Sequence, residues 1–294
     1  MKIYYHEDRV LITELFDFIP KHVFECGQCF RWEEQLDGSY TGVAHNRVIN
    51  VALNDNTLII SNTNRADFEK IWFEYFDLGR DYSEIRQRLA RDKRMEPVVD
   101  YGKGLRILKQ DEWECLISFI ISTNKNIEHI KKIVNEISNK FGDYITNYQG
   151  KDYYSFPEYF TIASLKISDI RDCMVGYRDK YIHGAAEYIN ANREWLYSLK
   201  YLEYEEASNE LKKLDGVGDK VSHCVMLFSM AHFKSFPVDI WIQRIMRALF
   251  SISGNNNEIK RLAEQQFGDY SGFAQQYLFY YAKENNIGSK NRKI

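Results

Sequence analysis

The sequence of 294 residues predicts an α+β fold, with an N-terminal antiparallel β domain over residues 1–105 and an all-α body over residues 106–294. Segments up to residue 62 alternate apolar and polar side chains, as half-buried strands do. Segments beyond residue 105 instead repeat their apolar side chains at helical spacing. Hydrophobic residues make up 45% of the chain, so a sizeable core can form.

In the first domain, strands are expected within the segments FECGQCFRWEEQ, GSYTGVAHNRVINVAL and TLIISN. Asn54-Asp55-Asn56 separates the last two segments and is typical of a hairpin turn. Two helical runs then follow, at residues 66–78 and 83–92. The domain should therefore be a small antiparallel sheet with helices after it.

In the second part, residues 106–195 should form one portion of the body, beginning with helices at 111–122 and 127–142. Thr123-Asn124-Lys125-Asn126 interrupts these two helices with polar groups. A hairpin of two helices is expected at 204–232, with the tight turn at Gly216-Val217-Gly218. Another amphipathic helix, IWIQRIMRALF, follows Asp239.

Charge and hydropathy exclude some classes of protein. The formal net charge of −3 argues against nucleic-acid binding by bulk charge, but a local basic face remains compatible with it. No apolar run approaches the length of a membrane span, and the N-terminus has no signal-peptide core. A cytoplasmic, nucleoid-associated protein without membrane contact is therefore expected.

The cysteines suggest a reducing compartment, since they number five. Cys26 and Cys29 form a C-x-x-C pair that invites a metal or redox interpretation. No second pair or histidine cluster completes a zinc site, so we interpret both as ordinary thiols and predict no metal site.

The helical hairpin carries the most informative residues. Glycines at a helix N-terminus leave backbone N–H groups open to phosphate. Lys220 opens the second helix, and Asp239 follows nineteen residues later, after Pro237-Val238. A surface lysine and an aspartate that merely caps its helix would be the simplest alternative.

The run Leu214, Gly216-Val217-Gly218 and Lys220, followed by Pro237-Val238-Asp239, resembles the helix-hairpin-helix DNA glycosylases of the HhH-GPD superfamily. Four more motifs resemble those of the 8-oxoguanine DNA glycosylase/AP lyases. The chain therefore resembles a bacterial member of the eukaryotic-type branch of these enzymes. These motifs are G-Q-C-F-R-W from Gly27, S-T-N-K-N-I from Ser122, G-Y-R-D-K-Y from Gly176, and G-F-A-Q-Q-Y-L-F ending at Phe279. The resemblance spans roughly residues 10 to 285 and implies a TBP-like N-terminal domain.

This resemblance also implies partners and cofactors. The expected partner is double-stranded DNA containing 8-oxoguanine, bound by a monomer. No cofactor should be required, although the hairpin backbone could hold a structural cation. Relatives with an iron–sulfur cluster have four closely spaced C-terminal cysteines, and this chain has none after Cys224, so no cluster is expected.

The resemblance implies a role for each matching residue. Lys220 would be the nucleophile, provided that burial or a nearby cation favours the neutral amine, and Asp239 would stabilise positive charge on the sugar. The base pocket would comprise the Gly27 carbonyl, Cys224, Gln275 and Phe279. The DNA contacts would come from Gly216, Val217, Gly218, Asn124, His129, Tyr177 and Arg178.

Simpler interpretations exist for several of these positions. Gly27 could mark a strand-end bulge, Phe279 could be a core residue, and Cys224 could be a small buried hydrophobe. The whole chain could also be a non-enzymatic DNA-binding module, or a glycosylase for alkylated or other oxidised bases. The hairpin lysine disfavours the alkylated-base hypothesis, because such relatives usually lack it.

One position departs from the family pattern. Two arginines and an asparagine surround the orphaned cytosine in the eukaryotic-type enzymes, and Asn124 and Arg178 match two of these three. The second arginine is replaced by His129 in this sequence. Histidine lacks the planar fork of donors, so we predict a relaxed preference for the opposite base. Alternatively, His129 faces solvent and Lys125 or Lys132 makes this contact.

Overall fold

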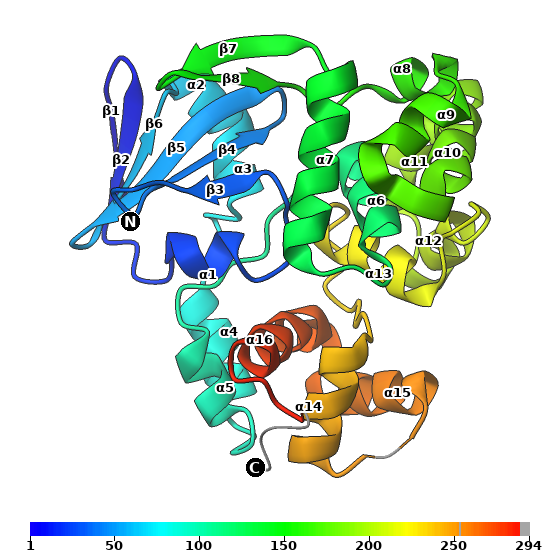
Figure 1. Ribbon diagram of the computed structural model, residues 1–294. Helices are drawn as coiled ribbons and strands as arrows, with labels where there is room; N and C mark the ends of the chain where they lie inside the picture. The colour runs from blue at the N-terminus through cyan, green and yellow to red at the C-terminus, as the bar shows by residue number, and fades with distance from the viewer. Residues whose placement is uncertain (253, 289–294) are drawn as a thin grey trace.

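The computed structural model describes residues 1–252 and 254–288. Its first region is an antiparallel six-stranded sheet of order β1-β2-β6-β5-β4-β3 (Figure 1). The strands are β1 (Lys2–Tyr5), β2 (Arg9–Thr13), β3 (Trp32–Glu34), β4 (Tyr40–Ala44), β5 (Arg47–Asn54) and β6 (Thr57–Ser61). The predicted turn is confirmed, because β5 and β6 pair up to Asn54 and Thr57, and Asp55 adopts a positive φ of 53°.

The sheet buries one face against short helices, and β2 and β6 alternate buried and more exposed residues as the sequence predicted. The predicted alternation is wrong for β4, which is buried throughout, and for the first half of β5. Val10, Ile12, Leu58 and Ile60 point into this first core. Covering it are α1 (Pro20–Phe24), α2 (Arg65–Asp67), the π-helical turn η1 (Phe68–Trp72) and α3 (Phe73–Tyr75). The aromatic rings of Phe24 and Trp32 stack here with centroids 3.9 Å apart.

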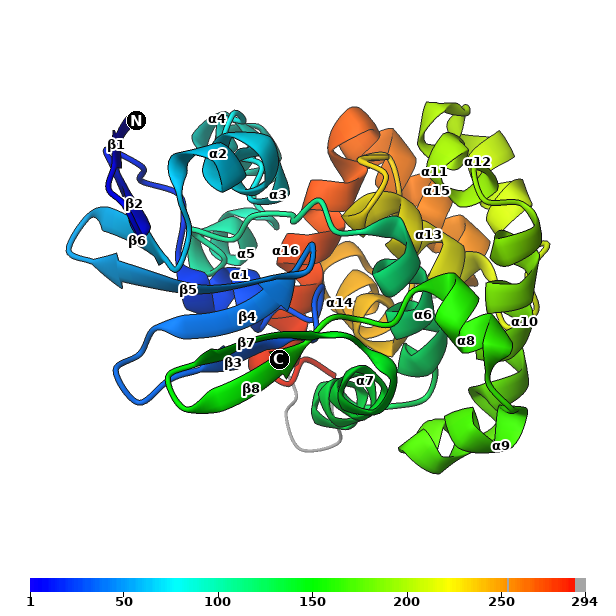
Figure 2. The same cartoon turned by 90° about the horizontal axis from the view of Figure 1, so that it is seen from above.

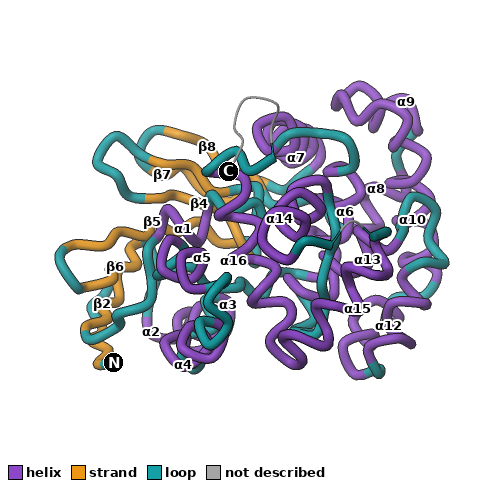
Figure 3. Tube along the Cα trace, turned by 90° about the horizontal axis from the view of Figure 1, so that it is seen from below, coloured by secondary structure: helices purple, strands orange, loops and turns teal. Residues whose placement is uncertain are grey.

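The remaining helices form the body, most of which lies beside the sheet domain (Figure 3). They are α4 (Tyr82–Leu89), α5 (Glu96–Tyr101), α6 (Glu112–Ser122), α7 (Ile127–Phe141), α8 (Tyr159–Ser164), α9 (Ile167–Ile170), η2 (Arg171–Val175), η3 (Gly176–Arg178), α10 (Asp179–Ala191), α11 (Trp195–Ser198), η4 (Leu199–Tyr201), α12 (Tyr204–Leu211), α13 (Asp219–Phe228), α14 (Ile240–Phe250), α15 (Asn256–Phe267), η5 (Gly268–Tyr270) and α16 (Ser271–Glu284). The predicted helices at 111–122, 127–142 and around the hairpin are confirmed to within a few residues.

One part of the all-α prediction is wrong. Strands β7 (Tyr144–Tyr148) and β8 (Lys151–Tyr154) form a hairpin inside the second region. It lies between the β5 strand of the main sheet and helix α7 (Figure 2). The turn at Gln149-Gly150, where both residues have positive φ, permits this tight connection.

The two hydrophobic cores divide at a different place from residue 105. Tyr82, Ile85 and Val98 of helices α4 and α5 pack into the core of the body, and α5 lies against α16. The segment before residue 105 therefore contributes to both cores.

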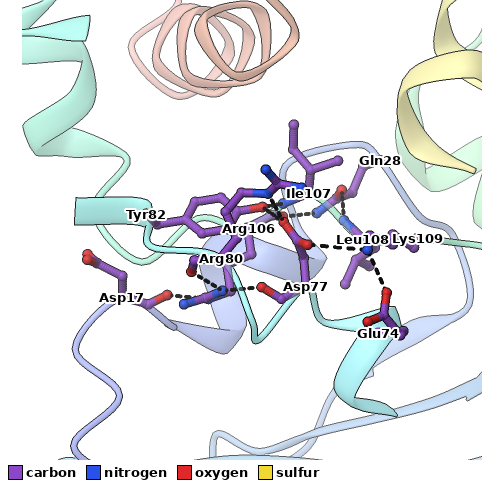
Figure 4. A network of polar contacts seen from close by, with 10 residues as sticks. All are labelled: Asp17, Gln28, Glu74, Asp77, Arg80, Tyr82, Arg106, Ile107, Leu108 and Lys109. Carbon is purple, nitrogen blue, oxygen red and sulfur yellow. Dashed lines mark hydrogen bonds and ion pairs between the residues drawn. The ribbon is translucent and has the colours of Figure 1, made fainter. Parts of the chain in front are cut away.

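A buried polar network joins these two regions (Figure 4). The Arg106 guanidinium donates to the carbonyl oxygens of Asp17, at 2.6 Å, and Asp77, at 2.7 Å. The Tyr82 hydroxyl donates to the Asp77 carboxylate and accepts from the Ile107 N–H. Because these buried groups satisfy one another, the connecting segment has a fixed path between sheet and body.

Candidate functional site

The helical hairpin presents its turn to solvent. Gly216 has φ of +83°, and a Cβ there would lie 2.6 Å from the Tyr181 ring, so only glycine fits. The Val217 N–H donates to the Leu214 carbonyl at 3.1 Å and closes the turn. Gly218 precedes α13, and both glycines are exposed while Val217 is buried. The first N–H groups of α13 are therefore accessible to an anion.

Lys220 lies in the first turn of α13 and is half-buried. Its Nζ donates to the Ser122 hydroxyl at 2.8 Å and lies 5.1 Å from the centroid of the Phe119 ring. Both neighbours belong to helix α6 and are uncharged. The amine is thus held at the interface of two helices, away from bulk solvent on one side.

Asp239 caps helix α14, as the simpler interpretation expected. Its carboxylate accepts the Ile242 N–H at 2.9 Å. Burial raises the pKa of Asp239, whereas this hydrogen bond and the nearby Lys220 charge act in the opposite direction. The hydrogen bond of the cap fixes the orientation of the Asp239 carboxylate. Its role as a helix cap is therefore compatible with a role in catalysis.

Cys224 lies one helical turn after Lys220 and is buried. Burial raises the pKa of its thiol to about 11, against the influence of the Lys220 charge. The thiol is therefore protonated at neutral pH, and the side chain presents a small, weakly polar surface.

The predicted pocket residues come together from opposite ends of the chain. Gly27 has φ of +78°, and a Cβ there would lie 3.0 Å from Phe279 Cε1 and 3.2 Å from Ile127 Cδ1. Gly27 occupies a loop between α1 and β3, not a strand end. Phe279 lies on α16 and is only partly buried, so the glycine backbone and this ring face each other directly.

Gln275 precedes Phe279 by one turn of α16 and is 4% exposed. Its Nε2 donates to the Pro237 carbonyl at 3.3 Å, which connects it to the segment leading into Asp239. Its Oε1 has no hydrogen-bond partner within residues 1–252 and 254–288. This oxygen can therefore still accept a hydrogen bond.

Gln28, which follows Gly27, has a structural role. Gln28 Nε2 donates to the carbonyls of Val23 and Arg106, and its Oε1 accepts the Leu108 N–H (Figure 4). Gln276 Nε2 donates to the Cys26 carbonyl at 2.9 Å. These bonds secure the Gly27 loop from both sides, so the motif positions the glycine without contacting the pocket.

The residues expected around an orphaned base flank the α6–α7 junction. Asn124 is exposed with φ of +54°, His129 is exposed in the first turn of α7, and Tyr177 is 59% exposed. Arg178, by contrast, is 4% exposed. Its guanidinium donates to the carbonyls of Val175 and Thr123, and therefore supports the junction from beneath.

Several residues at the site have no role that their motifs predict. Ser122 and Phe119 contact Lys220, and the Ile127 side chain lies beside Gly27. Met174 has φ of +63° and is exposed close to Tyr177 along the chain. Ser122 and Ile127 belong to a motif already noted, but spacing alone does not say what they touch.

The five cysteines are all buried and free. Burial raises the pKa of Cys26 to about 11. Among the residues that the structure describes, no cluster of three or more histidine, cysteine or acidic side chains could hold a metal ion. None of the described helices combines the length and the apolar character that crossing a membrane requires.

Helix-hairpin-helix DNA glycosylases carry a lysine after the glycine turn and an aspartate further on, and this chain places Lys220 and the helix-capping Asp239 at those positions. The chain belongs to the HhH-GPD superfamily of base excision DNA repair proteins, whose family model matches residues 117–268. Residues 10–116 match the model of the 8-oxoguanine DNA glycosylase N-terminal domain. The predicted family and the α+β architecture are thereby confirmed.

Individual relatives agree with this family. The chain is 30% identical to the N-glycosylase/DNA lyase OGG1 of Arabidopsis thaliana, over 87% of this chain and 75% of that protein. It is 42% identical to the 8-oxoguanine glycosylase/lyase of Clostridium acetobutylicum bound to double-stranded DNA, with a TM-score of 0.95 and coverage of 98% and 99%. A structure of MBOgg1 with a low-affinity DNA ligand is 44% identical, with a TM-score of 0.94 and coverage of 97% and 100%.

Proposed function

We propose that this protein is a bifunctional DNA glycosylase/AP lyase that excises 8-oxoguanine from double-stranded DNA in base excision repair. The observation that carries the proposal is the half-buried Lys220 amine, which lies near Asp239 and one turn from the pocket residue Cys224. The name of the Arabidopsis relative supports the two activities, and that of the Clostridium enzyme supports 8-oxoguanine as the substrate.

The lesion must first leave the base stack, because its glycosidic bond is inaccessible inside a duplex. The exposed N–H groups at Gly216–Gly218 and the start of α13 would hold a backbone phosphate and fix register. The exposed Tyr177 ring would act as the wedge that fills the vacated position.

The chemistry then uses Lys220 as nucleophile. The neutral amine forms a bond from Nζ to C1′, and the glycosidic bond breaks with its electron pair leaving on the base, which takes up a proton. Loss of a proton from nitrogen and opening of the C1′–O4′ bond give a Schiff base. Removal of a C2′ proton then expels the 3′ phosphate oxygen and cuts the strand.

Asp239 would stabilise the positive charge that develops on the sugar as the base leaves. Its carboxylate is already oriented by the Ile242 N–H and does not have to reorganise during the reaction. Partial burial strengthens its electrostatic effect.

The pocket would recognise the lesion by its added hydrogen. Guanine N7 is a bare acceptor, whereas 8-oxoguanine carries a hydrogen there that the Gly27 carbonyl can accept. The base would lie between Phe279 and the Cys224 thiol. The free Oε1 of Gln275 is suited to accept hydrogen bonds from the Watson–Crick edge of the base.

We also propose that the enzyme accepts bases other than cytosine opposite the lesion. His129 is exposed at the expected position but has a shorter side chain than arginine, and the Arg178 guanidinium is engaged with backbone carbonyls. Fewer donors are then free for the O2 and N3 acceptors of cytosine.

Several accompanying expectations complete the proposal. We expect a monomer that acts in the cytoplasm on nucleoid DNA, with no cofactor and no iron–sulfur cluster. The carbonyl oxygens of the turn between α12 and α13 are hard ligands of the kind a structural cation takes. They would hold such an ion through backbone alone and contribute rigidity to the turn.

A substrate panel tests the proposed activity. Duplexes containing 8-oxoguanine, an alkylated adenine or thymine glycol would be incubated with the enzyme and analysed for base release and strand cleavage. We expect both products from the 8-oxoguanine duplex. Strong binding without cleavage would instead indicate a non-enzymatic module, and preferential release of alkylated adenine would identify a different glycosylase.

A further inference from the structure

The Lys220 amine contacts two residues at the C-terminal end of α6. Its Nζ lies 2.8 Å from the Ser122 Oγ and 5.1 Å from the centroid of the Phe119 ring. Ser122 and Lys220 are 98 positions apart in the sequence, and the packing of α6 against α13 brings them together. The lysine side chain is therefore oriented by the body of the protein before any DNA binds.

The Ser122 hydroxyl can act toward Lys220 only as an acceptor while its own hydrogen bond persists. Ser122 Oγ donates to the Phe119 carbonyl at 2.8 Å, which uses its single hydrogen. The oxygen lone pairs remain and receive one N–H of the lysine. A hydroxyl in this arrangement engages a hydrogen of the amine and leaves the nitrogen lone pair unoccupied.

An uncharged acceptor suits a nucleophilic amine better than a carboxylate would. A carboxylate in contact with Lys220 would favour the protonated form, which cannot attack carbon. The serine oxygen accepts an N–H from either the charged or the neutral amine. The contact therefore persists when the lysine loses its proton.

The end of α6 that contacts Lys220 is also rigidly packed. The Phe119 ring stacks on Phe228 with centroids 5.5 Å apart and meets Phe30 edge-on at 5.6 Å. Phe119 and Ser122 are both buried. Because these side chains are buried and closely packed, this end of α6 holds its position, and the amine is placed against it.

We propose that Ser122 is a positioning residue for Lys220, with the buried Phe119 ring as the platform beneath the amine. The hydroxyl accepts one N–H and thereby turns the nitrogen lone pair toward C1′ of the flipped nucleotide. This inference rests on the proposed function, because it takes Lys220 as the nucleophile.

The test compares Ser122→Ala with Ser122→Thr, which retains the hydroxyl. We expect Ser122→Ala to slow single-turnover excision, and Schiff-base formation on a preformed abasic site, by about 10- to 100-fold. Its dissociation constant for lesion DNA should stay within about twofold of the wild type, and Ser122→Thr should recover most of the rate. Ser118→Ala is the matched control, since Ser118 is a buried serine one turn earlier on α6.

The outcomes separate this inference from the proposed function. Wild-type rates in Ser122→Ala would overturn the inference, as would equal losses in the alanine and threonine variants or a rate loss shared by Ser118→Ala. A loss confined to DNA affinity would also overturn it. Each of these leaves the nucleophile assignment intact if Lys220→Gln is inactive, whereas covalent trapping by Lys220→Gln would refute the proposed function itself.

Discussion

Gly27→Ala should damage the pocket far more than it damages the fold. The new Cβ would lie 3.0 Å from Phe279 Cε1 and 3.2 Å from Ile127 Cδ1, so the ring must shift by a few tenths of an ångström. An L-residue at the Gly27 φ of +78° costs about 1–2 kcal/mol. For a chain of this size that corresponds to a fall of roughly 2–3 °C in Tm.

Gly38→Ala is a matched control for this backbone cost. Gly38 has nearly the same φ, +79°, but no heavy atom of the described residues lies within 4 Å of a Cβ placed there. Both variants should therefore lose similar stability in thermal unfolding. In single-turnover assays, Gly27→Ala should lose excision of 8-oxoguanine on the order of 100-fold, because its methyl group enters the space between the carbonyl and the Phe279 ring.

The comparison can refute the pocket assignment directly. If Gly27→Ala excises as fast as Gly38→Ala, the Gly27 carbonyl does not contact the base. If Gly27→Ala unfolds far below Gly38→Ala, the loop serves stability and the loss of activity says nothing about recognition.

Three other predictions follow from the site and its surroundings. Asp239→Asn keeps a good helix cap, so its Tm should stay within a few degrees while single-turnover excision falls about 100-fold or more; equal excision would remove Asp239 from the chemistry. Burial lowers the pKa of His223 to about 4 from its usual 6.5, so the unfolding free energy should fall as pH drops from 6.5 to 4, by about 3 kcal/mol from this group. Denaturant titrations of His223→Gln should show a smaller pH dependence of the unfolding free energy. An unchanged pH dependence would contradict its assignment to His223. His129→Arg should raise the preference for cytosine opposite the lesion by about 10-fold or more in excision opposite C, A, G and T, and a wild type that already prefers cytosine strongly, with no change in the variant, would contradict it.

The parts of the molecule that the sequence predicted well are those with local signals. The hairpin of α12 and α13 follows from Gly216-Val217-Gly218 between two amphipathic runs, and the β5–β6 turn follows from Asn54-Asp55-Asn56. Each is determined by backbone preferences within a few residues. Neither requires knowledge of what packs against it.

The parts that escaped prediction depend on contacts between distant residues. The β7–β8 hairpin is short, exposed over much of its length and stabilised against the sheet and α7, so its own residues give little periodic signal. The contact of Ser122 with Lys220 depends on how two helices pack. The inward direction of Arg178 depends on carbonyl groups that only the folded junction provides.

The proposed chemistry also explains why the site is assembled from remote segments. The Gly27 loop meets Phe279 of α16 only when the sheet and the body are joined, and the proposed nucleophile Lys220 comes from a third segment, α13. The hydrogen bonds of Arg106 and Gln28 hold the sheet and the body together (Figure 4). Damage to the junction should therefore impair excision without touching a pocket residue.

The central claim is that the Lys220 amine forms a covalent bond with C1′ of the lesion nucleotide. Borohydride reduction during turnover on an 8-oxoguanine duplex converts the Schiff base into a stable adduct, which peptide mass mapping locates. We predict that the wild type forms this adduct at Lys220 and that Lys220→Gln forms none. An adduct at another residue, or no adduct from a wild type that still releases the base, would contradict the account.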